Sequence, residues 1–99
     1  MKIRDILNKD TATISFEVFP PKKSTDFGNV EAAALGIAAL QPAYMSVTYG
    51  AGGSTKGHTI ALAEEIQKKH NVPTVAHLTC VCADRSSIGA ALTEMQAAG

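Results

Sequence analysis

The chain has 99 residues and no net formal charge. It is 45% hydrophobic and 18% charged, a composition typical of globular domains rather than disordered segments. The balanced charge gives no indication of a nucleic acid or an anionic membrane surface as partner, and no stretch is apolar and long enough to span a bilayer.

The first strand is predicted near residues 13–18, after a short amphipathic turn at residues 1–8. Apolar and polar side chains alternate, so Glu17 falls on the polar face of an otherwise apolar strand. A carboxyl in such a strand is expected to be buried, and burial favours its protonated form. Glu17 is therefore expected either to pair with a lysine or arginine or to act as a general acid near neutral pH. Pro20 and Pro21 end the strand because proline cannot donate a ladder hydrogen bond.

A helix is predicted after this strand. Apolar residues recur at helical spacing through residues 27–40, with Thr25 or Asp26 as the expected cap. Pro42 ends the helix, and a second strand is predicted near residues 43–48.

The stretch Tyr44–Ser54 combines this second strand with a glycine-rich turn and the start of a helix. In the strand, Thr48 shares a face with Ser46, whereas Tyr49 lies on the opposite face. The turn leaves backbone N–H groups free at a helix N-terminus, where anions bind favourably. We interpret the stretch as one wall of a ligand site, followed by a helix over about residues 55–70.

A third strand is predicted near residues 74–79. One of its faces carries Val75, His77 and Thr79, and the other carries Ala76, Leu78 and Cys80. A last helix is expected to begin at Asp84, Ser86 or Ser87 and to end near Gly99. Its apolar stripe consists of Ile88, Ala91, Leu92 and Met95.

The order of these elements predicts an α/β fold with parallel strands in the order 1-2-3 and helices on one side of the sheet. Every strand has polar side chains near its C-terminal end, which is the active-site end of a (β/α)₈ barrel or of an open doubly wound sheet. A barrel of this type needs about 250 residues. Residues 1–99 are therefore expected to form the first three βα units of a partial (β/α)₈ TIM barrel, as an N-terminal fragment of one larger domain.

The glycine-rich turn matches known phosphate-binding motifs only in part. It departs from the dinucleotide fingerprint at Thr55, and the acidic residue expected about 20 positions later is missing. P-loop spacing places His58 where a lysine is required. A plain connection between strand and helix remains the alternative to a ligand-binding turn.

The residues His77, Cys80 and Cys82 could bind zinc, but in a strand His77 points away from Cys80, and no fourth ligand has suitable spacing. Buried thiols behind the strand are the favoured interpretation. His77 is either a core histidine or a ligand contact on the face it shares with Glu17 and Thr48. Two cysteines do not make a secreted disulfide framework, and no signal peptide is recognisable, so we expect a reducing, cytoplasmic location.

Three segments together resemble the methylenetetrahydrofolate reductase family of one-carbon metabolism. They are Ser-Phe-Glu-Val-Phe-Pro-Pro-Lys at residues 15–22, Ser-Val-Thr-Tyr-Gly-Ala-Gly-Gly at residues 46–53 and Ala-His-Leu-Thr-Cys at residues 76–80. They are spaced as in that family, and the resemblance runs over nearly the whole chain. Val18 departs mildly from the pattern, since many relatives carry phenylalanine there.

The resemblance implies a flavoenzyme in which NADH or NADPH reduces FAD, and 5,10-methylenetetrahydrofolate is then reduced to 5-methyltetrahydrofolate. Glu17 resembles the family's acid, which protonates a nitrogen of the folate imidazolidine ring. Thr48 resembles the nicotinamide-side contact, and Tyr49, Ala51 and His77 resemble flavin contacts. The full-length enzyme is expected to be a homo-oligomer.

Residues 1–99 alone are not expected to be active, because the family's later flavin- and folate-binding segments are not among them. The alternative, of a different class, is a small non-catalytic α/β binding or scaffold module that keeps the three motifs.

Overall fold

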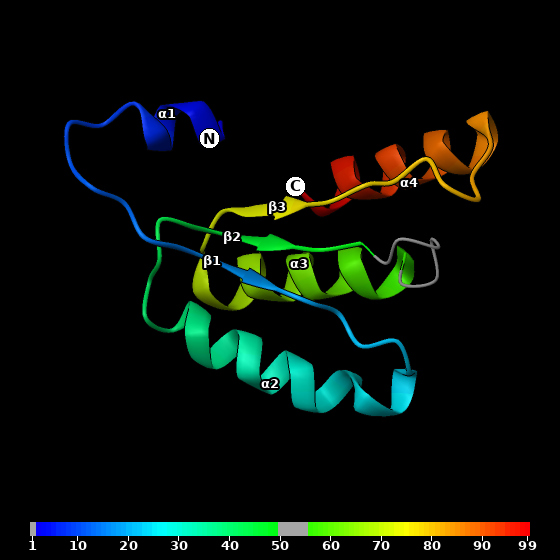
Figure 1. The fold of residues 1–99 in the computed structure, drawn as a ribbon, viewed down its shortest axis with the longest axis horizontal. Coiled ribbons are helices and arrows are strands. Elements are labelled where there is room, and N and C mark those ends of the chain that lie inside the picture. The colour runs from blue at the N-terminus through cyan, green and yellow to red at the C-terminus, as the bar shows by residue number, and fades with distance from the viewer. Residues whose placement is uncertain (1, 50–55) are drawn as a thin grey trace.

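A computed structural model describes residues 2–49 and 56–99 as a single α/β layer pair (Figure 1). In chain order its elements are α1 (Ile3–Leu7), β1 (Ser15–Val18), a 3₁₀ turn (Ser24–Asp26), α2 (Phe27–Ala38), β2 (Tyr44–Val47), α3 (Lys56–His70), β3 (Thr74–Ala76) and α4 (Arg85–Ala98). None of these helices has the length and hydrophobicity that crossing a bilayer requires.

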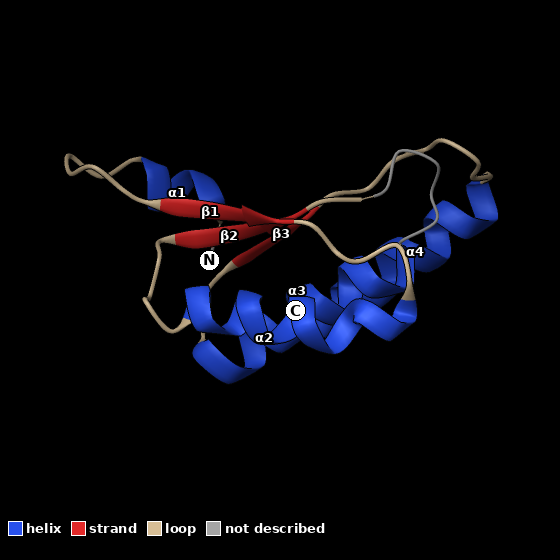
Figure 2. Cartoon of the chain, turned by 60° about the horizontal axis from the view of Figure 1, so that its bottom comes forward, coloured by secondary structure: helices blue, strands red, loops and turns tan. Residues whose placement is uncertain are grey.

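The three strands are parallel and lie in the order β1-β2-β3, as the sequence predicts. The register places Glu17 opposite Ser46, and Ser46 opposite Val75. Figure 2 shows α2, α3 and α4 together on one face of the sheet. The predicted α/β class, strand order and one-sided helix layer are therefore confirmed, and the arrangement is that of a partial (β/α)₈ barrel.

The core fills the space between the sheet and its helix layer. Met45 and Val47 of β2 are fully buried there because they lie on the helix-facing side of the central strand. They pack with residues of α2, α3 and the segment before β3, namely Ala34, Ala38, Leu62, Ala63, Ile66 and Val72. Burial of each large apolar side chain contributes roughly 1.5–3 kcal/mol. The other residues of β2, Tyr44 and Ser46, are left for the opposite face.

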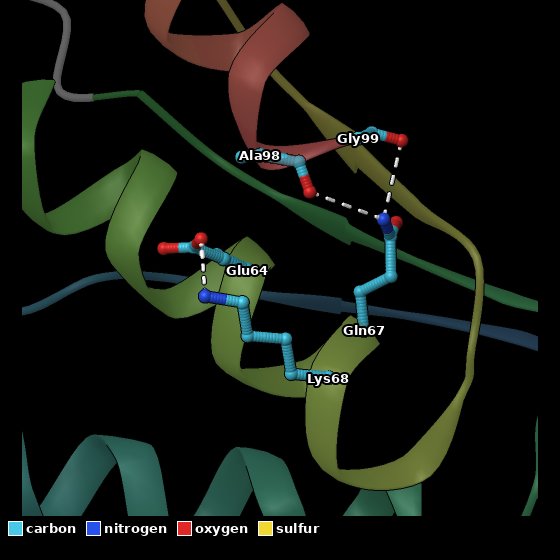
Figure 3. A network of polar contacts seen from close by, with 5 residues as sticks. All are labelled: Glu64, Gln67, Lys68, Ala98 and Gly99. Carbon is cyan, nitrogen blue, oxygen red and sulfur yellow. Dashed lines mark hydrogen bonds and ion pairs between the residues drawn. The ribbon is translucent and has the colours of Figure 1, made fainter.

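The C-terminal end of α4 is fixed to α3 and β3 by one side chain. Gln67 Nε2 donates to the carbonyl oxygens of Ala98 at 3.5 Å and Gly99 at 3.1 Å (Figure 3). Thr74 Oγ1 in turn donates to Gln67 Oε1 at 3.1 Å. Next to this network the Glu64–Lys68 ion pair, at 2.6 Å, spans one turn of α3. The two bonds from Gln67 satisfy carbonyls at the end of α4, where a helix offers no partner of its own.

The ends of two elements differ from the sequence prediction. β3 ends at Ala76 rather than near residue 79, and just past its end the His77 N–H donates to the carbonyl oxygen of Val47, the last residue of β2, at 3.0 Å. α2 ends at Ala38, and Leu40, predicted in its apolar stripe, is 73% exposed. Gln41 adopts a left-handed backbone with φ of 56°, which turns the chain away from the helix.

The other helix boundaries follow local sequence signals closely. α3 ends at His70, and the next residue, Asn71, has a left-handed φ of 54°. Asp84 caps α4 with a full capping box, whereas Asp26 stands at the N-cap of α2 without a side-chain capping bond. In α4 the predicted stripe is wrong at one position, since Leu92 is 53% exposed.

Candidate functional site at the C-terminal ends of the strands

Side chains from β1, from β2 and from the residue after β3 meet on the face of the sheet opposite α2, α3 and α4. Strand alternation sends Met45 and Val47 into the core and therefore turns Ser46 to this open face. The same alternation brings Glu17 of β1 to this face, because it pairs with Ser46. His77 comes directly after β3, two residues beyond Val75, which also pairs with Ser46, so His77 belongs to the same face. The Glu17–Ser46–His77 cluster, named for these three residues, lies where the strands end.

One carboxylate oxygen joins the three side chains. Ser46 Oγ donates to Glu17 Oε2 at 2.9 Å. His77 Nε2 lies 3.6 Å from the same oxygen, which is too long for a hydrogen bond but within range of an ion pair if the imidazole is protonated. The hydrogen bond from Ser46 engages Oε2 and leaves Oε1 outside this contact.

The cluster is open to solvent. The side chains of Glu17 and His77 are 48% and 43% exposed. The sequence-based expectation that Glu17 is buried is therefore wrong for this structure, since the helices that cover the sheet all lie on the other face. A lysine or arginine partner, the other expectation for Glu17, is also not what the described residues provide, because its partners are Ser46 and His77.

Thr48 continues the open face beyond Ser46. Its backbone N–H donates to the carbonyl oxygen of Val18 at 3.0 Å, so the exits of β1 and β2 are paired. Its own carbonyl oxygen accepts from the Thr59 hydroxyl at 2.9 Å, and Thr59 is fully buried in the first turn of α3. The position of Thr48 is thus set by hydrogen bonds on both sides.

Tyr49 lies apart from this cluster. Its side chain lines a small cavity of about 70 Å³ beneath the β3–α4 connection, together with residues such as Leu78, Cys82 and Ile88. Burial, and to a smaller extent the charge of Glu94, raise the pKa of its phenol. The Tyr49 side chain therefore follows the face that strand alternation predicts. Ala51, the remaining predicted flavin contact, lies outside the described residues.

Cys80 and Cys82 are both exposed free thiols, so the prediction of buried thiols behind the strand is wrong. They lie beyond the end of β3 in a turn closed by the Ala83 N–H and the Cys80 carbonyl at 3.3 Å. Within residues 2–49 and 56–99, His, Cys, Asp and Glu form no group of three that could hold a metal ion.

Two contributors to the site were not singled out by the sequence. Ser46 had been placed on the polar face, but its bond to Glu17 depends on the strand register, which is a tertiary property. His58, noted only as a mismatch to a P-loop lysine, has its Nδ1 3.1 Å from the carbonyl oxygen of Pro21. Alternation alone could have identified Ser46, whereas nothing local signals the contact of His58.

The comparisons with known proteins agree with one another. The family model described as methylenetetrahydrofolate reductase matches residues 2–99. The chain belongs to the methylenetetrahydrofolate reductase family. It is 36% identical over 96 residues to methylenetetrahydrofolate reductase 2 of Schizosaccharomyces pombe, and 34% identical over 91 residues to 5,10-methylenetetrahydrofolate reductase of Buchnera aphidicola subsp. Schizaphis graminum. An Arabidopsis thaliana relative at 32% identity over 98 residues is named methylenetetrahydrofolate reductase (NADH) 1.

These matches cover most of this chain but a minor part of each family member. The match to the Schizosaccharomyces pombe relative covers 93% of this chain and 15% of that protein. For the Buchnera aphidicola relative the two shares are 86% and 31%, and for the Arabidopsis thaliana relative they are 99% and 17%. The predicted family is thus confirmed, and the region that the chain shares with its relatives contains the Glu17–Ser46–His77 cluster.

Proposed function

We propose that this chain forms part of a flavin-dependent oxidoreductase that reduces 5,10-methylenetetrahydrofolate to 5-methyltetrahydrofolate with NAD(P)H. The observation that carries the proposal is the Glu17–Ser46–His77 cluster at the C-terminal ends of parallel strands, in a chain of this family. Active sites of β/α barrels lie at that end of the strands.

Glu17 acts as the general acid. Opening the imidazolidine ring of the folate requires a nitrogen to leave, and a neutral amine leaves far more easily than an amide anion. Glu17 Oε1 is free of the Ser46 hydrogen bond, which engages Oε2, and so can hold the proton that the departing nitrogen takes. The open face above Glu17 gives a planar substrate access to this oxygen.

The proposal puts a flavin and a nicotinamide on the same open face. A bound FAD supplies the redox step that carries hydride from NAD(P)H to the folate. In this proposal His77 contacts FAD and Thr48 contacts the nicotinamide, and the 43% exposure of the His77 side chain beside Glu17 supports its part. Tyr49 would contact the flavin through its backbone, because its side chain lines the cavity beneath the β3–α4 connection. The NADH in the name of the plant relative supports a nicotinamide as reductant.

The whole enzyme, rather than these residues alone, carries the activity. The described sheet has three strands, and its β1 and β3 each pair with β2 only, so a closed barrel needs further strands. We expect residues 1–99 alone to be inactive, and the complete enzyme to be a cytoplasmic homo-oligomer.

Glu17→Gln in the complete reductase tests the proposal. Glutamine keeps the shape of the side chain but cannot donate a labile proton in this role, whereas hydride uptake from NAD(P)H needs no protein acid. Stopped-flow absorbance should show near-normal hydride uptake and a folate half-reaction slower by about 10²–10⁴.

The wild-type enzyme and a conservative Glu17→Asp variant serve as controls, since aspartate keeps an acid at a shorter reach. Equal slowing of both half-reactions in Glu17→Gln would make Glu17 a structural residue. A wild-type protein that reduces no folate would refute the proposed reaction and favour a non-catalytic module.

A further inference from the structure

Two consecutive residues in the first turn of α3 hold the exits of two different strands. His58 Nδ1 lies 3.1 Å from the carbonyl oxygen of Pro21, which follows β1. Thr59 Oγ1 donates to the carbonyl oxygen of Thr48, which follows β2, at 2.9 Å. The start of α3 therefore bridges the strand ends that carry Glu17 and Thr48.

The contact of His58 with Pro21 fixes the protonation of one ring nitrogen. A carbonyl oxygen only accepts hydrogen bonds, so His58 must carry a proton on Nδ1 and donate it. The ring also packs against Phe27, the first residue of α2, with centroids 5.3 Å apart and planes tilted by 48°. One side chain of α3 thus contacts both the β1 exit and the start of α2.

Two backbone contacts hold the segment after Glu17. The Val18 carbonyl accepts from the Thr48 N–H at 3.0 Å, and β1 ends at that residue. Pro20 and Pro21 are buried but have no N–H, so only their carbonyls can be anchored by hydrogen bonds. Glu17 therefore lies just before two backbone anchors, the Val18 carbonyl and the Pro21 carbonyl.

We propose that His58 is a positioning residue for Glu17. By holding the Pro21 carbonyl, it fixes the segment that leaves β1 and with it the position of the Glu17 carboxyl beside Ser46 and His77. This rests on the proposed acid role of Glu17. A displacement of a catalytic group by about 1 Å can cost on the order of 10²-fold in rate, so loss of this anchor should affect the step that needs the acid.

Matched substitutions separate the hydrogen bond from the bulk of the ring. Asparagine places its amide nitrogen one bond from Cγ, as His58 Nδ1 is, whereas glutamine places its nitrogen further out, near the position of Nε2. Phenylalanine keeps the ring packing on Phe27 but has no donor. A positioning role therefore predicts that His58→Asn resembles the wild type, and that His58→Gln and His58→Phe do not.

The kinetic test uses the complete reductase. In His58→Gln and His58→Phe we expect the folate half-reaction to slow by about 10- to 100-fold and hydride uptake from NAD(P)H to stay within about twofold of the wild type. His58→Asn should restore most of the folate rate. Equal slowing of both half-reactions, or a normal folate rate in all three variants, would overturn the proposal.

A second measurement is independent of any folate chemistry. Hydrogen exchange of the Thr48 amide reports its bond to the Val18 carbonyl at the β1 exit. Exchange should be faster in His58→Gln and His58→Phe than in the wild type and His58→Asn. Unchanged exchange in all variants would overturn the positioning role even if the reductase is active. A wild type without folate reduction would refute the proposed function, while this exchange pattern would still decide the anchoring.

Discussion

The carboxyl of Glu17 shows how two unlike contacts can share one atom. Its Oε2 accepts from Ser46 at 2.9 Å and lies 3.6 Å from His77 Nε2. The side chains of Glu17 and His77 are nearly half exposed, and an exposed ion pair contributes little because water screens it. The neutral hydroxyl of Ser46, at true hydrogen-bond distance, is therefore the contact that sets the orientation of Glu17.

Replacing Ser46 tests this at the level of one hydrogen bond. Ser46→Ala should slow the folate half-reaction on the order of tenfold, because an ordinary hydrogen bond contributes about 0.5–1.5 kcal/mol. Hydride uptake should be little affected. Ser46→Thr, which keeps the hydroxyl and suits a strand, should retain the folate rate, as measured by stopped flow. A normal folate rate in Ser46→Ala would show that Ser46 does not orient Glu17.

Among the elements, α4 has the most complete start. The Ser87 N–H donates to Asp84 Oδ1 at 2.7 Å, and the Asp84 N–H donates to Ser87 Oγ at 3.0 Å. The backbone N–H of Ser87 first, and its hydroxyl second, hold the pKa of the Asp84 carboxyl below its usual value. A carboxyl whose pKa is lower in the folded state stabilises the fold above its unfolded-state pKa, and this contribution is lost as the pH falls.

Asp84→Asn should remove this pH dependence while keeping the cap, because asparagine is an equally good N-cap residue. The wild type should lose stability relative to Asp84→Asn as the pH falls below about 4, near the ordinary pKa of aspartate. Urea unfolding of the wild type and of Asp84→Asn at a series of pH values measures the difference in their free energies of unfolding. Asp84→Ala should be less stable than both across the range. Parallel pH profiles for the wild type and Asp84→Asn would contradict the prediction.

At the scale of the whole molecule, the sheet formed by the described residues has two free edges, at β1 and β3. The edge at β1 is flanked by exposed apolar side chains, including Ile14, Phe19 and Leu40, whose exposed fractions are 69%, 68% and 73%. Ile14, Phe16, Leu40 and neighbouring residues line a cavity of about 490 Å³ at this edge. Free strand edges next to apolar surface favour pairing with other chains. We expect the isolated 99-residue polypeptide to self-associate and to retain no flavin.

A charge on this edge should weaken the association. Ile14→Lys introduces a lysine beside the free edge of β1. Self-association then loses the burial of one isoleucine, roughly 1.5–3 kcal/mol, which raises the dissociation constant of the self-associated polypeptide about 10- to 100-fold. Leu92→Lys, at an exposed leucine of α4, is the matched control and should associate like the wild type. Sedimentation velocity over a concentration series distinguishes them. A wild-type chain that stays monomeric and yellow with bound flavin would contradict this expectation.

The sequence by itself determined the kind and order of the elements. Alternation in residues 44–49 placed Met45 and Val47 on the buried face and Ser46 on the open face, because strand side chains alternate whatever the partner. Asp84 as a helix cap and Asn71 as a helix stop were equally local. The three motifs determined the family.

Only the tertiary structure decided which of these residues meet. Glu17 and Ser46 are 29 positions apart, and His58 and Pro21 are 37 apart, so their contacts depend on the register between strands and on how α3 packs. The solvent exposure of Glu17, Cys80 and Cys82 also differed from expectation, because exposure depends on which face the helices cover and where β3 ends. Periodicity fixes the direction of a side chain along its own strand, whereas the partner it meets there is set by packing between elements.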